Sequence, residues 1–423
     1  METTHSSSTT ADVIIVGGGI GGLTAALSLH AAGIEALVLE SAREIRPLGV
    51  GINLQSAAVR ELDELGLLDE LGALGVPVVE QKFVNNSGRT LFGEARGKAA
   101  GYNWDLYSVH RGELQMMLLD AVVKRLGPDA VRTGVQVEGF EETADGVRLH
   151  AVDRATGSQV TFTAGAVVGA DGIHSTLRGL LHPDEGPLKW SGVTMWRGVA
   201  EAESFAPGNS VVIAVDDKKT GLVAYQISGA ALKRGRTLIN WVCLVPTGRP
   251  GPLGSDVSWN APGKIEDLLP HYADWDFDWA DLRDLFAKSE EILEYPMVDR
   301  DPLPSWGRGR ITLLGDAAHP GYPAGANGGT QAIIDARVLA YHLAVEPDVT
   351  KALAAYEADR VPATAAIVLA NREVDRVGRN TSGSGTASGK DLEELTDSYD
   401  RTTGEAEKLN GRASLTPPRV ERG

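Results

Sequence analysis

Three glycines and one carboxylate near the N-terminus have the types and spacing that a bound dinucleotide needs. Gly17, Gly19 and Gly22 follow the β-branched run Asp12–Val16. Glu40 ends a second apolar run about 20 residues further on. Gly17 permits a tight turn, Gly19 lets a pyrophosphate touch the backbone, and Gly22 lets a helix pack closely on the strand. Glu40 would accept hydrogen bonds from the adenosine ribose. This motif alone does not distinguish NAD from FAD.

Two aspartates further along the chain also follow apolar runs. Asp171 comes after Ala166–Ala170, and Asp316 comes after Ile311–Gly315. If these runs are parallel strands, their carboxyl ends line one crevice and the three turns meet around a single ligand. Taken singly, Asp171 could be a turn former and Asp316 the N-cap of the next helix. Together with the glycine motif, they favour a ligand site.

A glycine-rich loop follows the second aspartate. It covers Pro320–Thr330 and leads into the helical pattern Gln331–Leu343. Its glycines free backbone N–H groups to point outward, and the helix start adds partial positive charge. Such a loop would stabilise an electron-rich ring such as a reduced flavin. A loop without a ligand could look similar.

A Rossmann-type α/β domain is the fold that can position these groups. Asp12–Val16, Leu23–Leu29 and Ala36–Leu39 have the patterns of a strand, a helix and a strand. They predict a βαβ unit, with the glycine turn between its first strand and its helix.

The stretch 181–293 has a different pattern. Apolar runs between polar turns predict an antiparallel sheet, with strands at Val193–Ala200, Val211–Val215, Leu222–Ser228 and Thr237–Val245. Inserted into the Rossmann-type domain, this sheet can cover the cofactor and form a substrate chamber at the domain interface. Its aromatic residues Trp196, Tyr225 and Trp241 suit a planar ring, but each alone is better explained as core.

Composition excludes several kinds of partner. The 423 residues carry a formal net charge of -17, which makes nucleic acid and membrane surfaces poor partners. The first ten residues lack the features of a signal peptide, and no apolar stretch approaches the roughly 20 residues that cross a bilayer. The lone cysteine, Cys243, fits a buried position in a reducing compartment. We expect a cytoplasmic protein, and we predict no metal site.

The ordered motifs resemble the fingerprints of a known enzyme family. The stretches that carry the resemblance are Gly17–Gly22, Gly169–Gly172 and Gly315–His319. In order and spacing they are similar to those of the single-component FAD-dependent aromatic hydroxylases, over about residues 11–372. Within that family the chain is most similar to the phenazine hydroxylases, through Ile45–Asn53, His110–Met116, Thr194–Val199 and Tyr295–Pro304.

The resemblance implies a tightly bound FAD. Arg111 would neutralise phosphate charge and contact the ribityl chain, Val137 would reach the adenine through its backbone, and Val50–Ile52 would run along the isoalloxazine. Without the family, Arg111 could be a surface partner of Glu113 or Gln115. The implied cofactor-binding residues are Gly17, Gly19, Ile20, Gly22, Glu40, Ser41, Val50, Gly51, Arg111, Val137, Asp171, Asp316, Gly325, Asn327, Gly328 and Gly329.

The resemblance also implies a substrate pocket and a reaction. We predict that Tyr225, Asn53, Pro323 and Trp196 line the pocket. NADH or NADPH would bind transiently and reduce the flavin, which would then take up O2 as a C4a-hydroperoxide and hydroxylate an aromatic ring. We assign no catalytic side chain, because the flavin does the chemistry. One departure from the family is Ala326-Asn327-Gly328, where many relatives carry Gly-Gln-Gly.

We expect the substrate to be a small aromatic acid, in the first place a phenazine carboxylate. Loss of its carboxyl on hydroxylation stays open, and a salicylate-like or quinoline-like acid would fit the same chemistry. A reductase or dehydrogenase that inserts no oxygen is the alternative function, since the fold does not exclude it. A non-catalytic flavin-binding sensor is a third, and homodimer formation stays open.

The chain divides into two interleaved domains and two polar ends. We assign residues 11–77, 106–180 and 294–376 to the FAD-binding domain, and residues 78–105 and 181–293 to the substrate domain. Residues 1–10 read as a disordered leader, and residues 377–423 read as a polar, solvated C-terminal tail.

Overall fold

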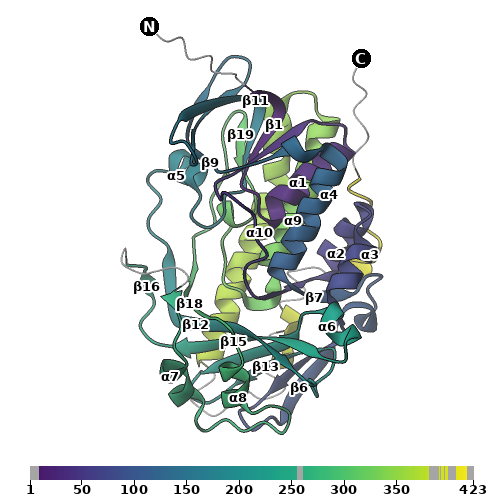
Figure 1. Ribbon diagram of the computed structural model, residues 1–423, viewed down its shortest axis with the longest axis vertical. Coiled ribbons are helices and arrows are strands. Elements are labelled where there is room, and N and C mark those ends of the chain that lie inside the picture. Colours follow the sequence, from purple (N-terminus) through teal and green to yellow (C-terminus); the bar gives the residue numbers. More distant parts are fainter. Residues whose placement is uncertain are drawn as a thin grey trace.

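The glycine turn connects strand β1 (Thr9–Val16) to helix α1 (Ile20–Ala31), and strand β2 (Ala36–Glu40) follows. The predicted βαβ unit is therefore confirmed. The computed structural model describes residues 9–254, 261–380, 390, 392–394, 396–398 and 406–416. Helix α1 is buried along most of its length because it has almost no polar face. It lies between helices α4 (Arg111–Leu126) and α9 (Gly328–Val345) (Figure 1).

Seven strands form the sheet of the Rossmann-type domain, in the order β8-β2-β1-β11-β10-β9, with β19 paired to β11. The further strands are β8 (Val131–Thr133), β9 (Val135–Glu142), β10 (Val147–Asp153), β11 (Gln159–Gly169) and β19 (Ile311–Leu313). Strands β8, β2, β1, β11 and β19 run parallel, whereas β10 is antiparallel to both of its neighbours.

The strand register brings the predicted turns to one edge of this sheet. Val16 pairs with Leu39 and with Gly169, and Gly169 pairs with Leu313. Four parallel strands therefore end level with one another, and the turns that follow them lie side by side. This confirms the convergence that the strand-end pattern predicted.

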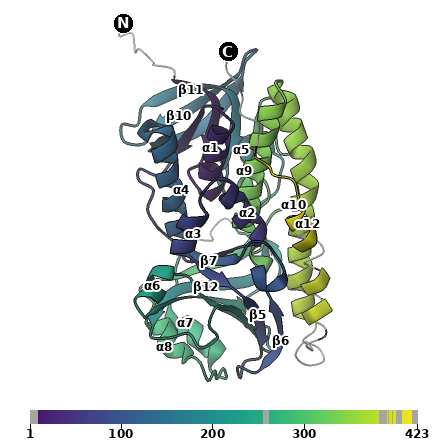
Figure 2. The ribbon, with the colours of Figure 1, turned by 90° about the vertical axis from the view of Figure 1, so that its right-hand side faces the viewer.

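Helices and a small sheet complete the domain. A three-stranded sheet contains β3 (Gly51–Leu54), β7 (Leu106–His110) and β4 (Val76–Val78). The helices are α2 (Ser56–Glu64), α3 (Leu68–Leu74), η2 (Pro128–Ala130), α5 (Thr176–Leu181), η4 (Gly315–Ala317), η5 (Ala324–Ala326), α10 (Val349–Asn380) and α12 (Ala406–Asn410). Helix α10 runs along one side of the molecule from the first sheet to the second (Figure 2).

A second, nine-stranded sheet has the order β17-β18-β12-β15-β14-β13-β5-β6, with β16 paired to β12. Its strands are β5 (Glu80–Val84), β6 (Thr90–Ala95), β12 (Lys189–Ala202), β13 (Ser210–Val215), β14 (Gly221–Gln226), β15 (Thr237–Pro246), β16 (Gly251–Pro252), β17 (Ala261–Pro262) and β18 (Ile292–Asp299). Its helices are η1 (Gly97–Ala100), α6 (Gly229–Lys233), α7 (Ile265–Leu268), η3 (Leu269–Tyr272) and α8 (Leu282–Ala287). All its pairings are antiparallel except that of β13 with β5.

Three predicted boundaries differ from the structure. Residues 9 and 10, assigned to the leader, pair with β11, and residues 294–299, assigned to the FAD-binding domain, pair with β12 or with β17. Part of the predicted solvated tail packs on the protein, since Leu409 is buried and Leu415 contacts the main core. Residues 1–8 and 381–389 lie outside the described residues. Among the described helices, none is long and apolar enough to span a membrane.

Candidate active site

The three glycines of the first turn have different surroundings. Gly17 has a φ of +113°, and a Cβ added there would lie 2.3 Å from the Ala170 carbonyl oxygen. A Cβ on Gly22 would lie 2.0 Å from the Gly17 carbonyl oxygen. A Cβ on Gly19 would meet nothing within 4 Å. Two of the glycines are therefore required by the fold, whereas Gly19 leaves open space in front of the N-terminus of α1, which begins at Ile20. A pyrophosphate fits such a space.

Glu40 fixes the backbone of this turn. Its Oε2 accepts a hydrogen bond from the Gly18 N–H at 2.7 Å, and its Oε1 accepts from the Ala42 N–H at 2.7 Å and from the Ser41 hydroxyl at 3.3 Å. The carboxylate is thus held at the end of β2, beside the open space at Gly19. Contact of Glu40 and Ser41 with a ribose stays a prediction.

Asp171 shapes its own turn. Its carboxylate accepts hydrogen bonds from the Ser175 hydroxyl at 2.5 Å and from the Thr176 N–H at 2.8 Å, at the start of α5. Burial raises the pKa of Asp171, although these hydrogen bonds act against the increase. The alternative of a turn former therefore describes its visible role, and its contact with a cofactor stays a prediction.

Asp316 faces the open side of the strand ends. Its side chain is exposed, and its Oδ1 lies 3.7 Å from the position of a Cβ on Gly328. The turn before it is held in place because the Gly315 N–H donates to the buried Asp335 carboxylate at 3.0 Å. An exposed carboxylate beside two glycine-rich turns suits the ribityl hydroxyls that we predict it to bind.

The glycine-rich loop is shaped by side chains from α9 and from Gln55. Gly325 and Ala326 have positive φ values of 64° and 55°. The Gly325 carbonyl accepts hydrogen bonds from the Gln55 and Asn327 side chains, at 2.9 Å and 3.2 Å. Asn327 is buried and also accepts from Gln331. Its side chain holds the loop, so any contact between Asn327 and the cofactor falls to its backbone. Pro323, Gly325 and Gly328 are exposed, and a Cβ added to Gly329 would make ordinary van der Waals contact with Ile52 and Leu54, at 3.5 Å and 3.6 Å.

Gly51 is where the two domains touch. Its N–H donates to the Asn240 side chain at 2.7 Å, and its carbonyl accepts from Arg197 Nη2 at 3.3 Å. A Cβ on Gly51 would lie 2.6 Å from Ile227 and 2.7 Å from Asn240. The strand β3 therefore lies directly against the second sheet. If Val50–Ile52 runs along the isoalloxazine, that sheet borders the flavin.

Comparisons with known proteins agree with this geometry. A family model described as FAD binding domain matches residues 10–251 and 280–371. The chain is 53% identical over 375 residues to a phenazine 1,6-dicarboxylic acid hydroxylase of Lysobacter antibioticus, which covers 88% of this chain and 92% of the relative. The chain belongs to the FAD-dependent monooxygenases.

Other members of this family extend the likeness. A 3-hydroxybenzoate 6-hydroxylase of Aquipseudomonas alcaligenes is 31% identical over 84% of this chain and 86% of its own. The structure of Klebsiella pneumoniae HpxO with FAD and uric acid superposes with a TM-score of 0.71 at 26% identity, over 96% of each chain. FAD is thus the cofactor of this monooxygenase, and NAD(P)H and O2 are its co-substrates.

One predicted pocket residue, Trp196, points away from the FAD-binding domain. Trp196 is buried on the far face of the second sheet, in a cluster with Leu222, Trp241 and Cys243. Successive strand residues point to opposite faces. It is therefore its neighbour Arg197 that faces the FAD-binding domain, as the contact with Gly51 shows. Cys243 is buried, as expected.

Three other predicted residues, Tyr225, Asn53 and Arg111, lie at or near the domain interface, whereas Val137 lies in strand β9. Tyr225 is buried on the sheet face that includes Val199 and Ile227. Asn53 accepts a hydrogen bond from the Ser108 hydroxyl. Arg111 begins α4 with an exposed side chain, and its N–H donates to the Val50 carbonyl at 3.0 Å. Val137 is buried in β9, and its contact with adenine stays a prediction.

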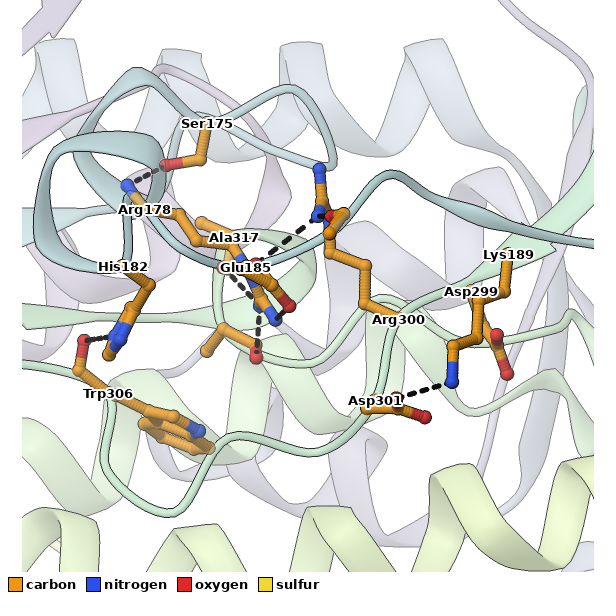
Figure 3. Close-up of polar contacts among 12 residues, drawn as sticks. Ser175, Arg178, His182, Glu185, Lys189, Asp299, Arg300, Asp301, Trp306 and Ala317 are labelled. Carbon is orange, nitrogen blue, oxygen red and sulfur yellow. Dashed lines mark hydrogen bonds and ion pairs between the residues drawn. The ribbon is translucent and has the colours of Figure 1, made fainter. Parts of the chain in front are cut away.

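Arg178 is a supporting residue that the sequence analysis missed. It is buried, and its Nη1 donates to the carbonyls of Ala317 and Ala318 at 2.9 Å and 2.6 Å, as Figure 3 shows for Ala317. It also forms two hydrogen bonds with Glu185, of 2.6 Å and 2.7 Å. Arg178 therefore fixes the turn that carries Asp316. The signal in the sequence was an arginine close behind the Asp171 turn.

Glu185 joins two of the connections between the domains, the one before β12 and the one after β18. It lies between α5 and β12, and it also contacts Arg300, which follows β18, at 3.2 Å (Figure 3). On the same side Lys189 pairs with Asp301. A cavity of about 150 Å³ opens beside these residues. It is smaller than the roughly 300–1,000 Å³ of typical ligand pockets, and no residue that lines it is a predicted substrate-pocket residue.

Proposed function

We propose that this monooxygenase hydroxylates a phenazine carboxylic acid and that the carboxyl group leaves from the carbon that receives oxygen. The observation that carries the proposal is the 53% identity, across most of both chains, to a hydroxylase of phenazine 1,6-dicarboxylic acid. The relatives named above are hydroxylases, so oxygen insertion is favoured over the reductase or dehydrogenase alternative.

The reaction balances with the co-substrates of the family. The carboxylate, O2, NAD(P)H and two protons give the phenol, CO2, water and NAD(P)+. One oxygen atom enters the ring and the other leaves as water. FAD supplies the oxygen chemistry when bound. The protein holds the cofactor at the level strand ends, presents the ring from the second sheet and keeps water away from the reacting carbon.

Product analysis under labelled dioxygen tests this function. The purified protein with FAD and NADH would be incubated with phenazine-1-carboxylic acid, phenazine-1,6-dicarboxylic acid, salicylate and a quinoline carboxylic acid. We expect a phenazine product that carries one labelled oxygen and lacks one carboxyl. A labelled product that keeps its carboxyl would overturn decarboxylation only. An unlabelled product would overturn oxygenation in favour of a reductase or dehydrogenase.

Three further properties stay predictions. Composition and charge favour a cytoplasmic protein that does not bind nucleic acid. Homodimer formation stays open, and the molar mass of the protein in solution would test it.

A further inference from the structure

Arg197 is a positive charge without a counter-ion in the part of the chain that the structure describes. Within the described residues, its one hydrogen bond joins Nη2 to the Gly51 carbonyl at 3.3 Å, and its Nε is buried without a partner. The four arginines that are buried outright in the described ranges have carboxylate partners: Arg60 and Arg337 pair with Glu61, Arg178 with Glu185 and Arg360 with Asp335. Burial lowers the pKa of Arg197, which reflects the cost of a charge that nothing neutralises. Such a group is expected where a ligand brings the missing charge.

The surroundings of Arg197 are apolar walls with hydroxyl donors. On the same strand face, Val193 and Met195 belong to one apolar cluster and Val199 to another. Tyr225 and Tyr295 lie close enough to Arg197 for each to change its pKa. Burial raises the pKa of Tyr225 to about 12, so at neutral pH this tyrosine is a neutral O–H donor. A guanidinium between apolar walls, with phenol donors beside it, matches an aromatic ring that bears a carboxylate.

Arg197 also lies where such an acid would meet the flavin. Its partner Gly51 belongs to the segment predicted to run along the isoalloxazine, and the side chain of Arg197 remains partly exposed. We propose that Arg197 binds the carboxylate of the aromatic substrate and selects acids over neutral rings. This inference rests on the proposed function, because it names the residue that recognises that substrate class.

A binding comparison of acids with their amides tests the proposal. The pairs are phenazine-1-carboxylic acid and its carboxamide, salicylate and salicylamide, and quinoline-2-carboxylic acid and its amide. Dissociation constants would be measured on the FAD-loaded enzyme by the change in flavin absorbance, for the wild type, Arg197→Gln, Arg197→Lys and Arg197→Met. Arg234→Gln is the control, because Arg234 is an exposed arginine of the same domain, 3.7 Å from Glu201.

We expect the wild type to bind its acid at least about 10-fold more tightly than the amide, as a charged hydrogen-bonded pair implies. Arg197→Gln and Arg197→Met should lose that preference. Their dissociation constants for the amide should stay within about 3-fold of the wild-type value, because the neutral amide does not form the charged hydrogen-bonded pair. Arg197→Lys should keep part of the preference, because lysine carries the charge without the planar fork. Arg234→Gln should behave as the wild type. Without a ligand, Arg197→Met should melt no lower than the wild type, because it removes an unpaired charge.

Several outcomes would overturn the role of Arg197. An acid preference that survives in Arg197→Gln and Arg197→Met would do so, as would equal weakening of acid and amide. Arg197 would instead be assigned to the cofactor if both neutral variants lose FAD and the acid preference does not change. That preference would be measured in Arg197→Lys and in the fraction of each neutral variant that keeps FAD. If no acid binds the wild type, the inference fails. If only salicylate or the quinoline acid binds, the phenazine proposal fails. The role of Arg197 is then decided by comparing the acid that binds with its own amide.

Discussion

Gly19 and Gly22 belong to one motif but meet opposite surroundings. A methyl group on Gly19 would project into open space, whereas one on Gly22 would overlap the Gly17 carbonyl oxygen at 2.0 Å. Gly19 also has an ordinary extended backbone, with φ −76° and ψ −178°. The fold therefore requires Gly22, whereas Gly19 leaves the space that we predict for the ligand.

We expect Gly19→Ala to change the unfolding free energy of the flavin-free protein by less than about 1 kcal/mol. It should weaken FAD binding by at least about 10-fold, because the methyl group occupies the space predicted for the pyrophosphate. Gly22→Ala should lower the unfolding free energy by about 1–3 kcal/mol or more, because two backbone segments must separate. Urea unfolding and FAD titration of both variants measure these effects. A destabilised Gly19→Ala with normal FAD affinity would contradict the assignment.

At the residue scale, the sequence predicted the motifs better than the direction of side chains. The Gly17 turn, Asp171 and Asp316 were found because a strand end followed by a glycine or an acid is a local signal. Trp196 and Arg197 are adjacent, so an error of one position exchanges the core face for the face towards the FAD-binding domain. Arg197 was visible as a charge within an apolar strand. Its missing counter-ion could be recognised only from the folded arrangement.

At the element scale, Asp335 connects three segments around the last turn. It lies fully buried on α9, and its carboxylate accepts from the Gly315 N–H at 3.0 Å, contacts His319 at 2.6 Å and accepts from Arg360 of α10 at 2.7 Å. Burial would raise its pKa, but the positive charge of Arg360 and the contact with His319 prevail and lower it from 3.8 to about 2.

Asp335→Asn should lower the unfolding free energy by about 3–5 kcal/mol at neutral pH, because Arg360 would be left buried without a carboxylate. The pKa of Asp335 is lower in the folded state, so its stabilisation is complete above about pH 4 and is lost as the pH falls towards 2. The stability difference between wild type and variant should therefore shrink over that range. Urea unfolding at pH 7, 4 and 3 measures it. Asp359→Asn, an exposed acid on α10, is the control. Equal stability of wild type and Asp335→Asn at pH 7 would contradict this account.

The element types were predictable because each has a local periodicity. Four strands of the second sheet, β12 to β15, appeared as apolar runs between polar turns, and the predicted Val193–Ala200 lies inside β12. Links between distant elements were not predictable, because α5 and η4 are joined by Arg178 across 139 positions of sequence. No pattern of propensity or spacing indicates such a pair.

At the scale of the whole molecule, Glu185 contacts two of the linkers that join the second sheet to the FAD-binding domain: the one before β12, to which it belongs, and the one after β18. Arg178 then connects Glu185 to the turn of Asp316, so the position of the second sheet is tied to the cofactor turn by one chain of contacts. The sequence placed the return to the FAD-binding domain at 294, five residues before β18 ends at Asp299. The strand continues past the composition change because β12 supplies a partner.

The C-terminal segment 406–416 is held by hydrogen bonds to helix α2 and to the backbone at 101 and 103. Arg60 Nη2 donates to the carbonyls of Arg412 and Ala413 at 3.1 Å and 2.9 Å, and Thr416 donates to Glu64 at 3.0 Å. The side chain of Asn410 makes two hydrogen bonds with the backbone at 101 and 103. A polar composition suggested a solvated tail, but hydrogen bonds to buried arginines are available to a polar segment as well.

Truncation after Glu405 should therefore destabilise the protein. It removes these hydrogen bonds and leaves Arg60 and Arg337 with unsatisfied donors, so we expect a loss of about 2–4 kcal/mol and a melting temperature lower by a few degrees. Truncation after Thr416 removes none of the contacts and is the matched control. Thermal melting of the two truncated chains in the FAD-loaded state compares them directly. If both truncated chains have the melting temperature of the full chain, segment 406–416 contributes nothing to stability. The prediction of a solvated tail would then describe its behaviour.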